Sequence, residues 1–243
     1  MKTKKIILTA VCILLILIIV AGVLFKISKS RTFQFWGGLT NRVNTSEKVV
    51  ALTFDDAPNP QVNEVLSVLK EKNVKATFYE IGENIEKYPQ EAKAIVEAGN
   101  EVGNHSYSHQ RFLLKSVAFA EKEVQETNEL IRSTGYLGEI TFRPPNGKKL
   151  FSLPWYLHKN NIKTITWDVE PDTFAKNLKE GDEKTEFLVK NTLENTKPGS
   201  IILLHPLCAS CASDREALGR IIDELQAKGY KFVTVSELLA LKQ

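Results

Sequence analysis

Short apolar runs alternate with amphipathic segments along most of the chain from Lys48 onward. Seven of these runs are continuous and short enough to be buried strands, and polar residues, glycine or proline separate them. The predicted strands cover residues 49–54, 76–81, 101–104, 140–143, 163–168, 201–205 and 230–233. Continuous apolar strands are typical of a sheet covered on both faces, so the pattern predicts an α/β fold with a parallel sheet.

Between the strands, apolar residues recur at helical spacing, as Val62, Val65, Leu66 and Leu69 do in the first such segment. The predicted helices cover residues 62–69, 85–98, 116–133, 153–160, 183–194, 214–228 and 235–241. About seven strand–helix units can close into a barrel of the TIM type, and an open doubly wound sheet is the alternative. No glycine-rich phosphate loop follows the first predicted strand, which leaves nucleotide binding without support.

The first 25 residues follow a different pattern, an unbroken uncharged run of 20 residues from Ile6 to Phe25. A helix of about 20 apolar residues can cross a bilayer, and Lys2, Lys4 and Lys5 would hold its first end in the cytoplasm. We therefore expect a single-pass helix in the cell membrane, with the rest of the chain extracytoplasmic. A cleaved signal peptide, which would release a secreted protein, is the main alternative, and a buried core helix is the other.

The charge of the chain is unevenly placed, which changes the meaning of its formal net charge of +3. Of the 32 basic residues, seven precede Glu47, whereas no acidic residue does. The rest of the chain has 25 basic and 29 acidic residues, so the excess of positive charge flanks the membrane and predicts no nucleic-acid partner. We expect residues 1–25 to be a basic tip and membrane anchor, residues 26–46 a stalk, and residues 47–243 the folded domain.

The composition of the 243 residues is ordinary for a globular protein, with 43% hydrophobic and 25% charged residues, and it excludes disordered and fibrous classes. Three cysteines are too few for a fold built on disulfides. Cys12 lies in the apolar run, where it faces lipid. Cys208 and Cys211 fit a local disulfide outside the cell, and two free thiols are the alternative.

Polar and titratable residues collect where the predicted strands end. These segments are Asp55-Asp56, His105 to His109, Arg143 to Gly147, Trp167 to Asp172, and Leu203 to His205. The carboxyl ends of parallel barrel strands lie on one face, where active sites are built, so we expect these residues to meet in one site. Three of the four histidines fall there, and His158 is the exception.

His105 and His109 are four residues apart, so on a helical turn they would share a face. Two imidazoles and one carboxylate make a three-ligand metal site that keeps a position open for water. Asp55-Asp56 supplies the carboxylate. Because alternation points two adjacent strand residues in different directions, we expect one aspartate to bind the metal and the other to act as a base.

The segment Thr53-Phe-Asp-Asp-Ala-Pro58 resembles the Thr-Phe-Asp-Asp-Gly-Pro signature of the polysaccharide deacetylases, the NodB-homology group or carbohydrate esterase family 4. Further motifs of the family have counterparts in the same order: His105-x-x-x-His109, Arg143-x-Pro145-x-Gly147, Trp167 to Asp172, and Leu203-x-His205. The resemblance runs from about Lys48 to the C-terminus. It implies a distorted (β/α) barrel, in agreement with the pattern of strands.

By this resemblance, a divalent metal is held by Asp56, His105 and His109. The metal is usually zinc, with Co²⁺, Ni²⁺ or Mn²⁺ as alternatives. Asp55 would be the general base, and His205 would be the general acid. The second role suits a histidine that titrates near neutrality.

The resemblance also implies supporting residues. Arg143 would orient Asp55, and the backbone N–H of Asn146 would help stabilise the oxyanion. Asp172 would orient His205 or support Arg143. Because the spacing of its segment departs from the family's pattern, Asp168 and Glu170 compete for that role.

Two further departures concern the backbone. Ala57 stands where the family has glycine, which disfavours a positive φ at that position. Asn146 stands where the family more often has tyrosine, which removes a ring and keeps the backbone donor.

The resemblance implies a metal-dependent hydrolase that removes N-acetyl groups from amino sugars of a cell-envelope polysaccharide, such as peptidoglycan or a chitin-like oligomer. Its partners would be the acetylated glycan and, through the N-terminal helix, the membrane; no obligate protein partner is evident. A hydrolase of another amide or of an O-acetyl ester is the alternative within enzymes. An inactive glycan-binding barrel is the other alternative, but it predicts the loss of a ligand, base or acid, and none is missing.

Overall fold

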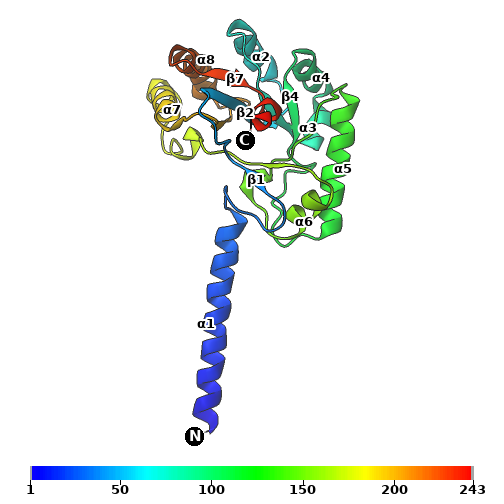
Figure 1. Ribbon diagram of the computed structural model, residues 1–243, viewed down its shortest axis with the longest axis vertical. Coiled ribbons are helices and arrows are strands. Elements are labelled where there is room, and N and C mark those ends of the chain that lie inside the picture. The colour runs from blue at the N-terminus through cyan, green and yellow to red at the C-terminus, as the bar shows by residue number, and fades with distance from the viewer. Residues whose placement is uncertain (1, 242–243) are drawn as a thin grey trace.

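The computed structural model describes residues 2–241, in which helices surround a parallel sheet and one long helix projects away from the domain (Figure 1). The strands are β1 (Leu39–Thr40), β2 (Val49–Ala57), β3 (Thr77–Glu80), β4 (Glu101–Asn104), β5 (Thr164–Ile165), β6 (Ile201–Leu204) and β7 (Lys231–Val233). The outermost residues of the predicted segments, Met1, Lys242 and Gln243, lie outside the described residues. The predicted α/β fold with a parallel sheet is confirmed.

The α-helices lie between and around these strands. They are α1 (Lys2–Ser28), α2 (Val62–Glu71), α3 (Gly82–Lys87), α4 (Pro89–Glu97), α5 (Val117–Ser133), α6 (Ser152–Lys159), α7 (Asp182–Asn195), α8 (Ala212–Ala227) and α9 (Val235–Ala240). Two short 3-10 helices, η1 (Pro145–Gly147) and η2 (Pro171–Thr173), lie in the loops that carry predicted site residues. Beside the site, Cys208 and Cys211 form a disulfide.

Parallel pairing joins the strands in the order β4-β3-β2-β6, and β7 pairs with the first residues of β2. Single-residue bridges continue this pairing. Phe142 bridges Asn104 and Thr164, and Val169 bridges Ile202. The pairing therefore runs from β4 through Phe142 to β5, and the chain that follows β5 reaches β6 through Val169. Because all of it is parallel, the carboxyl ends of the strands point the same way.

Strand β2 is buried on both faces, and its alternation separates two parts of the core. Val50, Leu52 and Phe54 pack in the large cluster beneath the helices. Val49 and Ala51 point the other way, into a second cluster that also includes residues of β6 and α9. Burying a side chain of this size contributes roughly 1.5–3 kcal/mol, so β2 is held from both sides.

Two predicted elements differ in the structure. The strand predicted at 140–143 is reduced to the bridges made by Phe142. The helix predicted at 85–98 is divided into α3 and α4, because Pro89 starts a new helix and Tyr88 has a non-helical backbone (φ −131°, ψ 58°). A proline inside one continuous helix would remove an intrahelical hydrogen bond and clash with the preceding turn.

The segment between α1 and β2, predicted as a stalk, contacts the domain. Its strand β1 pairs with β5, and Gln34 Nε2 donates to Thr164 Oγ1 at 3.2 Å. The Phe35 ring lies 5.0 Å from the Phe151 ring, so this aromatic residue packs on the domain. Val43 is 1% exposed and belongs to the second core cluster. These contacts depend on residues more than 100 positions away in the chain.

Helix α1 is exposed along most of its length and extends from the domain as a single rod (Figure 1), and its last residue, Ser28, is buried against the domain. The most apolar 18-residue window within Lys4–Ser28 has a mean hydropathy of 3.3, and none of this window is buried. At about 1.5 Å per residue, 25 residues span more than 35 Å. An apolar helix of this length near the N-terminus is typical of a signal sequence or a membrane anchor.

The burial of Val43 generates a prediction about stability. Val43→Ala removes two methyl groups from a packed site, so we expect it to lower the free energy of unfolding by about 2 kcal/mol. Leu137→Ala is the control, because Leu137 is 90% exposed and its truncation should change stability by less than about 0.5 kcal/mol. Denaturant unfolding followed by circular dichroism measures both. Equal stability of the two variants would mean that the 26–46 segment is not part of the core.

Candidate metal centre and acid–base site

Alternate residues of β2 point to the same face of the sheet. At the carboxyl end of the strand, the residues on the face of Val49 and Ala51 are Thr53 and Asp55, which lie beside a buried arginine. Arg143 Nη1 donates to Asp55 Oδ1 at 2.7 Å and to Thr53 Oγ1 at 2.8 Å. The guanidinium also lies over the Tyr79 ring, 4.0 Å from its centroid. Arg143 is fully buried and Asp55 is 4% exposed, so the pair is shielded from water.

The ion pair keeps Asp55 charged. Burial alone would raise the pKa of this carboxyl, but the charge of Arg143, followed by those of His105 and His205, outweighs burial and lowers the pKa below its ordinary value. Asp55 therefore stays a carboxylate throughout the neutral range. A carboxylate fixed in this way can accept a proton from a water molecule held next to it.

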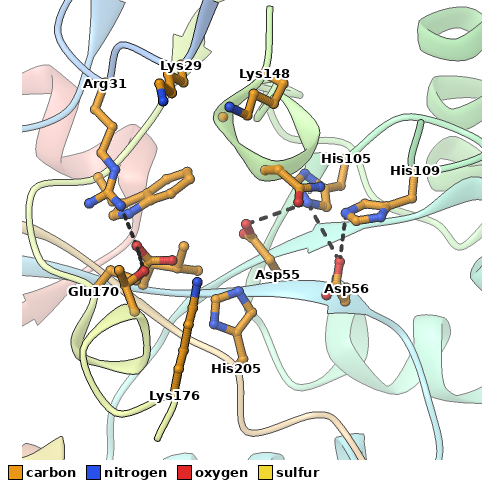
Figure 2. A pocket seen from close by; sticks show the side chains of 15 residues that line it. Lys29, Arg31, Asp55, Asp56, His105, His109, Lys148, Glu170, Lys176 and His205 are labelled. Atoms are coloured by element: carbon orange, nitrogen blue, oxygen red, sulfur yellow. Dashed lines mark hydrogen bonds and ion pairs between the residues drawn. The ribbon is translucent and has the colours of Figure 1, made fainter. Parts of the chain in front are cut away.

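Asp56, His105 and His109 form the predicted three-residue cluster (Figure 2). His109 Nε2 lies 3.2 Å from Asp56 Oδ1, and His105 Nε2 lies 3.7 Å from the same oxygen. One potential ligand atom from each residue lies within 4.8 Å of the others. Two imidazoles and one carboxylate at this spacing are the donor set of a zinc-type site.

The two histidines meet through a loop and not through the helical turn that their spacing predicted. His109 has a left-handed backbone (φ 53°), as does Ser106 (φ 68°), and the His109 N–H donates to Ser106 Oγ at 3.1 Å. Asp56 is also left-handed (φ 64°). Such backbone conformations are uncommon outside glycine and collect at functional sites. Because the positive φ falls at Asp56 and not at Ala57, the alanine in place of glycine is tolerated.

The cluster fits a divalent cation. Asp56 Oδ1 is shielded from solvent, yet it has no hydrogen-bond partner within residues 2–241. His105 Nδ1 lies 2.7 Å from the Arg143 carbonyl oxygen, which can only accept, so the proton is on Nδ1 and Nε2 is free to bind metal. Burial, followed by the charge of His105, lowers the pKa of His109, which favours the neutral imidazole that metal binding requires.

His205 lies across the pocket from these residues and contacts Asp172 (Figure 2 shows His205 below Asp55). His205 Nδ1 is 2.6 Å from Asp172 Oδ2. The two competing acids have other partners: Asp168 accepts from Ser200 Oγ and from the Ile201 N–H of β6, and Glu170 pairs with Arg31. Of the three acidic residues in the segment, Asp172 is thus the one that contacts His205.

The surroundings of His205 favour its protonated form. Burial would lower its pKa, but the hydrogen bond and charge of Asp172, followed by the charges of Asp55 and Asp56, outweigh burial and raise the pKa to about 9. Behind Asp172 lies Asp214, which the sequence gave no reason to single out. Its pKa is raised to about 6 by burial and then by the charge of Asp172, and its Oδ2 accepts from Lys184 Nζ at 2.8 Å.

One pocket of about 370 Å³ is lined by Asp55, Asp56, His105, His109 and His205, and Asp172 lies behind His205. Asn146 also lines the pocket; it has a left-handed backbone (φ 54°) within η1, which places the loop over the site. The sequence did not indicate Thr53, Tyr79 and Asp214 as separate site residues, although Thr53 lies within the quoted signature. It also did not indicate the basic residues of the rim, which are Lys29, Arg31, Lys148 and Lys176.

An Asp–His–His cluster that shares one pocket with a buried carboxylate and a histidine of raised pKa is the arrangement of a metal-dependent hydrolase site. The family model for "polysaccharide deacetylase" matches residues 42–165 of the chain. Together with relatives that are at least 30% identical over most of the chain, this match shows that the chain belongs to the polysaccharide deacetylase family.

Three known proteins illustrate the similarity. The peptidoglycan-N-acetylmuramic acid deacetylase PdaC of Bacillus subtilis is 34% identical over 83% of this chain, and the chain spans 41% of its length. A peptidoglycan-N-acetylglucosamine deacetylase of Bacillus cereus is 30% identical over 85% of this chain and 95% of its own. The crystal structure of BA3943, a CE4 family pseudoenzyme from Bacillus anthracis, matches with a TM-score of 0.74 and 30% identity, over 84% of this chain and 70% of that one.

The geometry of the cluster generates a prediction about metal binding. Asp56→Asn and His109→Ala each remove one of three ligands, so we expect either change to weaken Zn²⁺ affinity by at least about 100-fold. Isothermal titration calorimetry on the metal-free protein measures the affinity. His158→Ala is the control, because His158 does not line the pocket. Wild-type affinity in both ligand variants would place the metal elsewhere.

The contact between Asp172 and His205 generates a prediction about pKa. Asp172→Asn removes the carboxylate that outweighs burial, so we expect the pKa of His205 to fall from about 9 toward or below its ordinary value near 6.5. Nuclear magnetic resonance titration of the histidine ring in the metal-free protein measures it. Asp168→Asn is the matched control, because Asp168 bonds to β6 and should leave the pKa of His205 in place. An unchanged pKa in Asp172→Asn would exclude Asp172 as the partner.

Proposed function

We propose that this protein is a metal-dependent deacetylase that hydrolyses the N-acetyl groups of amino sugars in a cell-envelope glycan, with peptidoglycan as the leading candidate. The observation that carries the proposal is the placement of Asp55, which stays charged, and His205, which stays protonated, in one pocket with the Asp56–His105–His109 cluster. Two groups whose surroundings push their pKa values apart can act as base and acid at one pH. The peptidoglycan deacetylases among its relatives support the substrate class.

The proposed roles follow from position. Asp55, oriented by Arg143, accepts the proton of the attacking water, and His205, oriented by Asp172, donates a proton to the leaving amine. The backbone N–H of Asn146, at the edge of the pocket, would stabilise the oxyanion. Asp56, His105 and His109 would hold a divalent cation, Zn²⁺ by preference, which supplies Lewis-acid polarisation of the acetyl carbonyl when bound.

The fold and topology support this activity outside the cytoplasm. We infer that the parallel pairing of β2, β3, β4, β5 and β6, together with the bridges at Phe142 and Val169, forms a distorted (β/α) barrel. We also infer that residues 1–25 are a basic tip and a retained single-pass anchor, and that residues 47–243 form the catalytic domain. The 26–46 segment packs onto this domain and joins it to the anchor.

Acetate release tests the proposed activity. The full chain in detergent, supplied with Zn²⁺, should release acetate from peptidoglycan or from N-acetylglucosamine oligomers, and a chelator should abolish the release. His205→Ala should slow turnover by about 10²–10⁴-fold while zinc content stays the same, because it removes only the proton donor.

Three outcomes would contradict the proposal in different ways. If acetate is released only from O-acetylated glycans, the protein would be an esterase. If the zinc-loaded protein releases no acetate from any glycan, it would be a glycan-binding protein and not a deacetylase. A His205→Ala variant at the wild-type rate would remove His205 from the mechanism.

A further inference from the structure

Three lysines at the rim of the catalytic pocket, Lys29, Lys148 and Lys176, have no acidic partner among the described residues, and two of them lie together at one edge. Lys29 follows α1 directly, and Lys148 follows η1; both line the pocket that contains Asp55 and His205. Arg31, the nearest cation along the chain, pairs with Glu170. Within the described part of the chain, no ion pair includes Lys29 or Lys148. Figure 2 shows both side chains at the same edge of the pocket.

The two ammonium groups lie close to the same aromatic ring, that of Phe25. Lys29 Nζ lies 4.2 Å from the centroid of the Phe25 ring, and Lys148 Nζ lies 5.2 Å from the same centroid. Burial, followed by the charges of Lys29 and Arg111, lowers the pKa of Lys148. The positive charges of Lys29 and Lys148 repel each other, so an anion bound beside both of them would stabilise the arrangement.

Hydrogen bonds on both sides of Lys29 fix the position of its backbone. The Lys149 N–H donates to the Ser28 carbonyl at 2.9 Å, and Lys149 Nζ donates to the Ser30 carbonyl at 2.5 Å. These bonds tie the end of α1 to the residue next to Lys148. Further along, Thr166 Oγ1 donates to the Arg31 carbonyl at 2.7 Å. Lys29 is therefore presented by a braced backbone, unlike an ordinary surface lysine.

We propose that Lys29 and Lys148 form a subsite for a carboxylate carried by the glycan. The substrate would then be an acidic amino-sugar polymer, whose sugar bears a carboxylate directly or at the end of a short peptide. This inference rests on the proposed deacetylase function, because the two lysines line the same pocket as the acid–base pair. A carboxylate placed between them would orient the neighbouring N-acetyl group toward the Asp56–His105–His109 cluster. Ammonium groups bind anions as mobile point charges, which suits a carboxylate on a flexible substituent.

Equilibrium binding tests the subsite independently of catalysis. The probe is a muramic-acid-containing oligomer in two forms, one with free carboxylates and one converted to carboxamides, and calorimetry measures its affinity for the full chain in detergent. We expect the wild type to bind the acid form about tenfold more tightly, because charge-assisted hydrogen bonds from ammonium groups favour a carboxylate over a carboxamide, although solvent and salt screen them. Lys29→Gln/Lys148→Gln should lose this preference. Lys159→Gln is the matched control, because Lys159 also lies over an aromatic ring, that of Trp155, but outside the pocket.

The outcomes are separable. No preference in the wild type, or a full preference in Lys29→Gln/Lys148→Gln with an unchanged melting temperature, would overturn the subsite. A preference lost only in nanodiscs of anionic lipid, and kept in zwitterionic lipid, would assign the lysines to lipid phosphates and would also overturn it. Acetate release by the wild type is measured in parallel. If the wild type binds the acid form selectively and releases no acetate, the subsite stands and the proposed deacetylase function fails.

Discussion

The buried pair of Arg143 and Asp55 is the constraint on which the site depends. Removing either partner would leave an uncompensated charge inside the domain, which typically costs about 3–5 kcal/mol. The same arginine acts through its backbone, since its carbonyl accepts from His105 Nδ1 and leaves Nε2 facing Asp56. One residue thus fixes the charge of the proposed base and the tautomer of a proposed metal ligand. The loop that follows it, η1, carries Asn146 and Lys148 to the pocket edge.

Across the pocket, an acidic residue stabilises a positive charge, whereas at Asp55 a basic residue stabilises a negative one. His205 is held protonated by Asp172, and Asp214 and Lys184 continue the chain of charged groups toward α7 and α8. Neither side would keep its protonation state alone, because burial disfavours charge on both Asp55 and His205. The site therefore works as a unit of paired charges, in which each group depends on a partner from a distant part of the sequence.

The pattern of the chain predicted the residues that lie at strand ends, since parallel strands bring their carboxyl ends together wherever helices separate them. It placed Asp55, Asp56, Arg143 and His205 in one site for that reason. It did not predict the left-handed loop that joins His105 to His109, because a spacing of four is compatible with many backbones. Nor did it predict β1 or the rim position of Lys29. Both depend on pairing with residues more than 100 positions away, and no local periodicity records such contacts.

The connection between α1 and the pocket is short. Lys29 lines the pocket and is the first residue after the helix. The three residues from Lys29 to Arg31 span at most about 10 Å. Hydrogen bonds from Lys149 and Thr166 to their backbone hold them against the domain. With α1 retained in the bilayer, the enzyme would work in a thin layer at the membrane surface. It would meet glycan strands while they are still close to the machinery that makes them, and its access to the wall would be set by lateral diffusion.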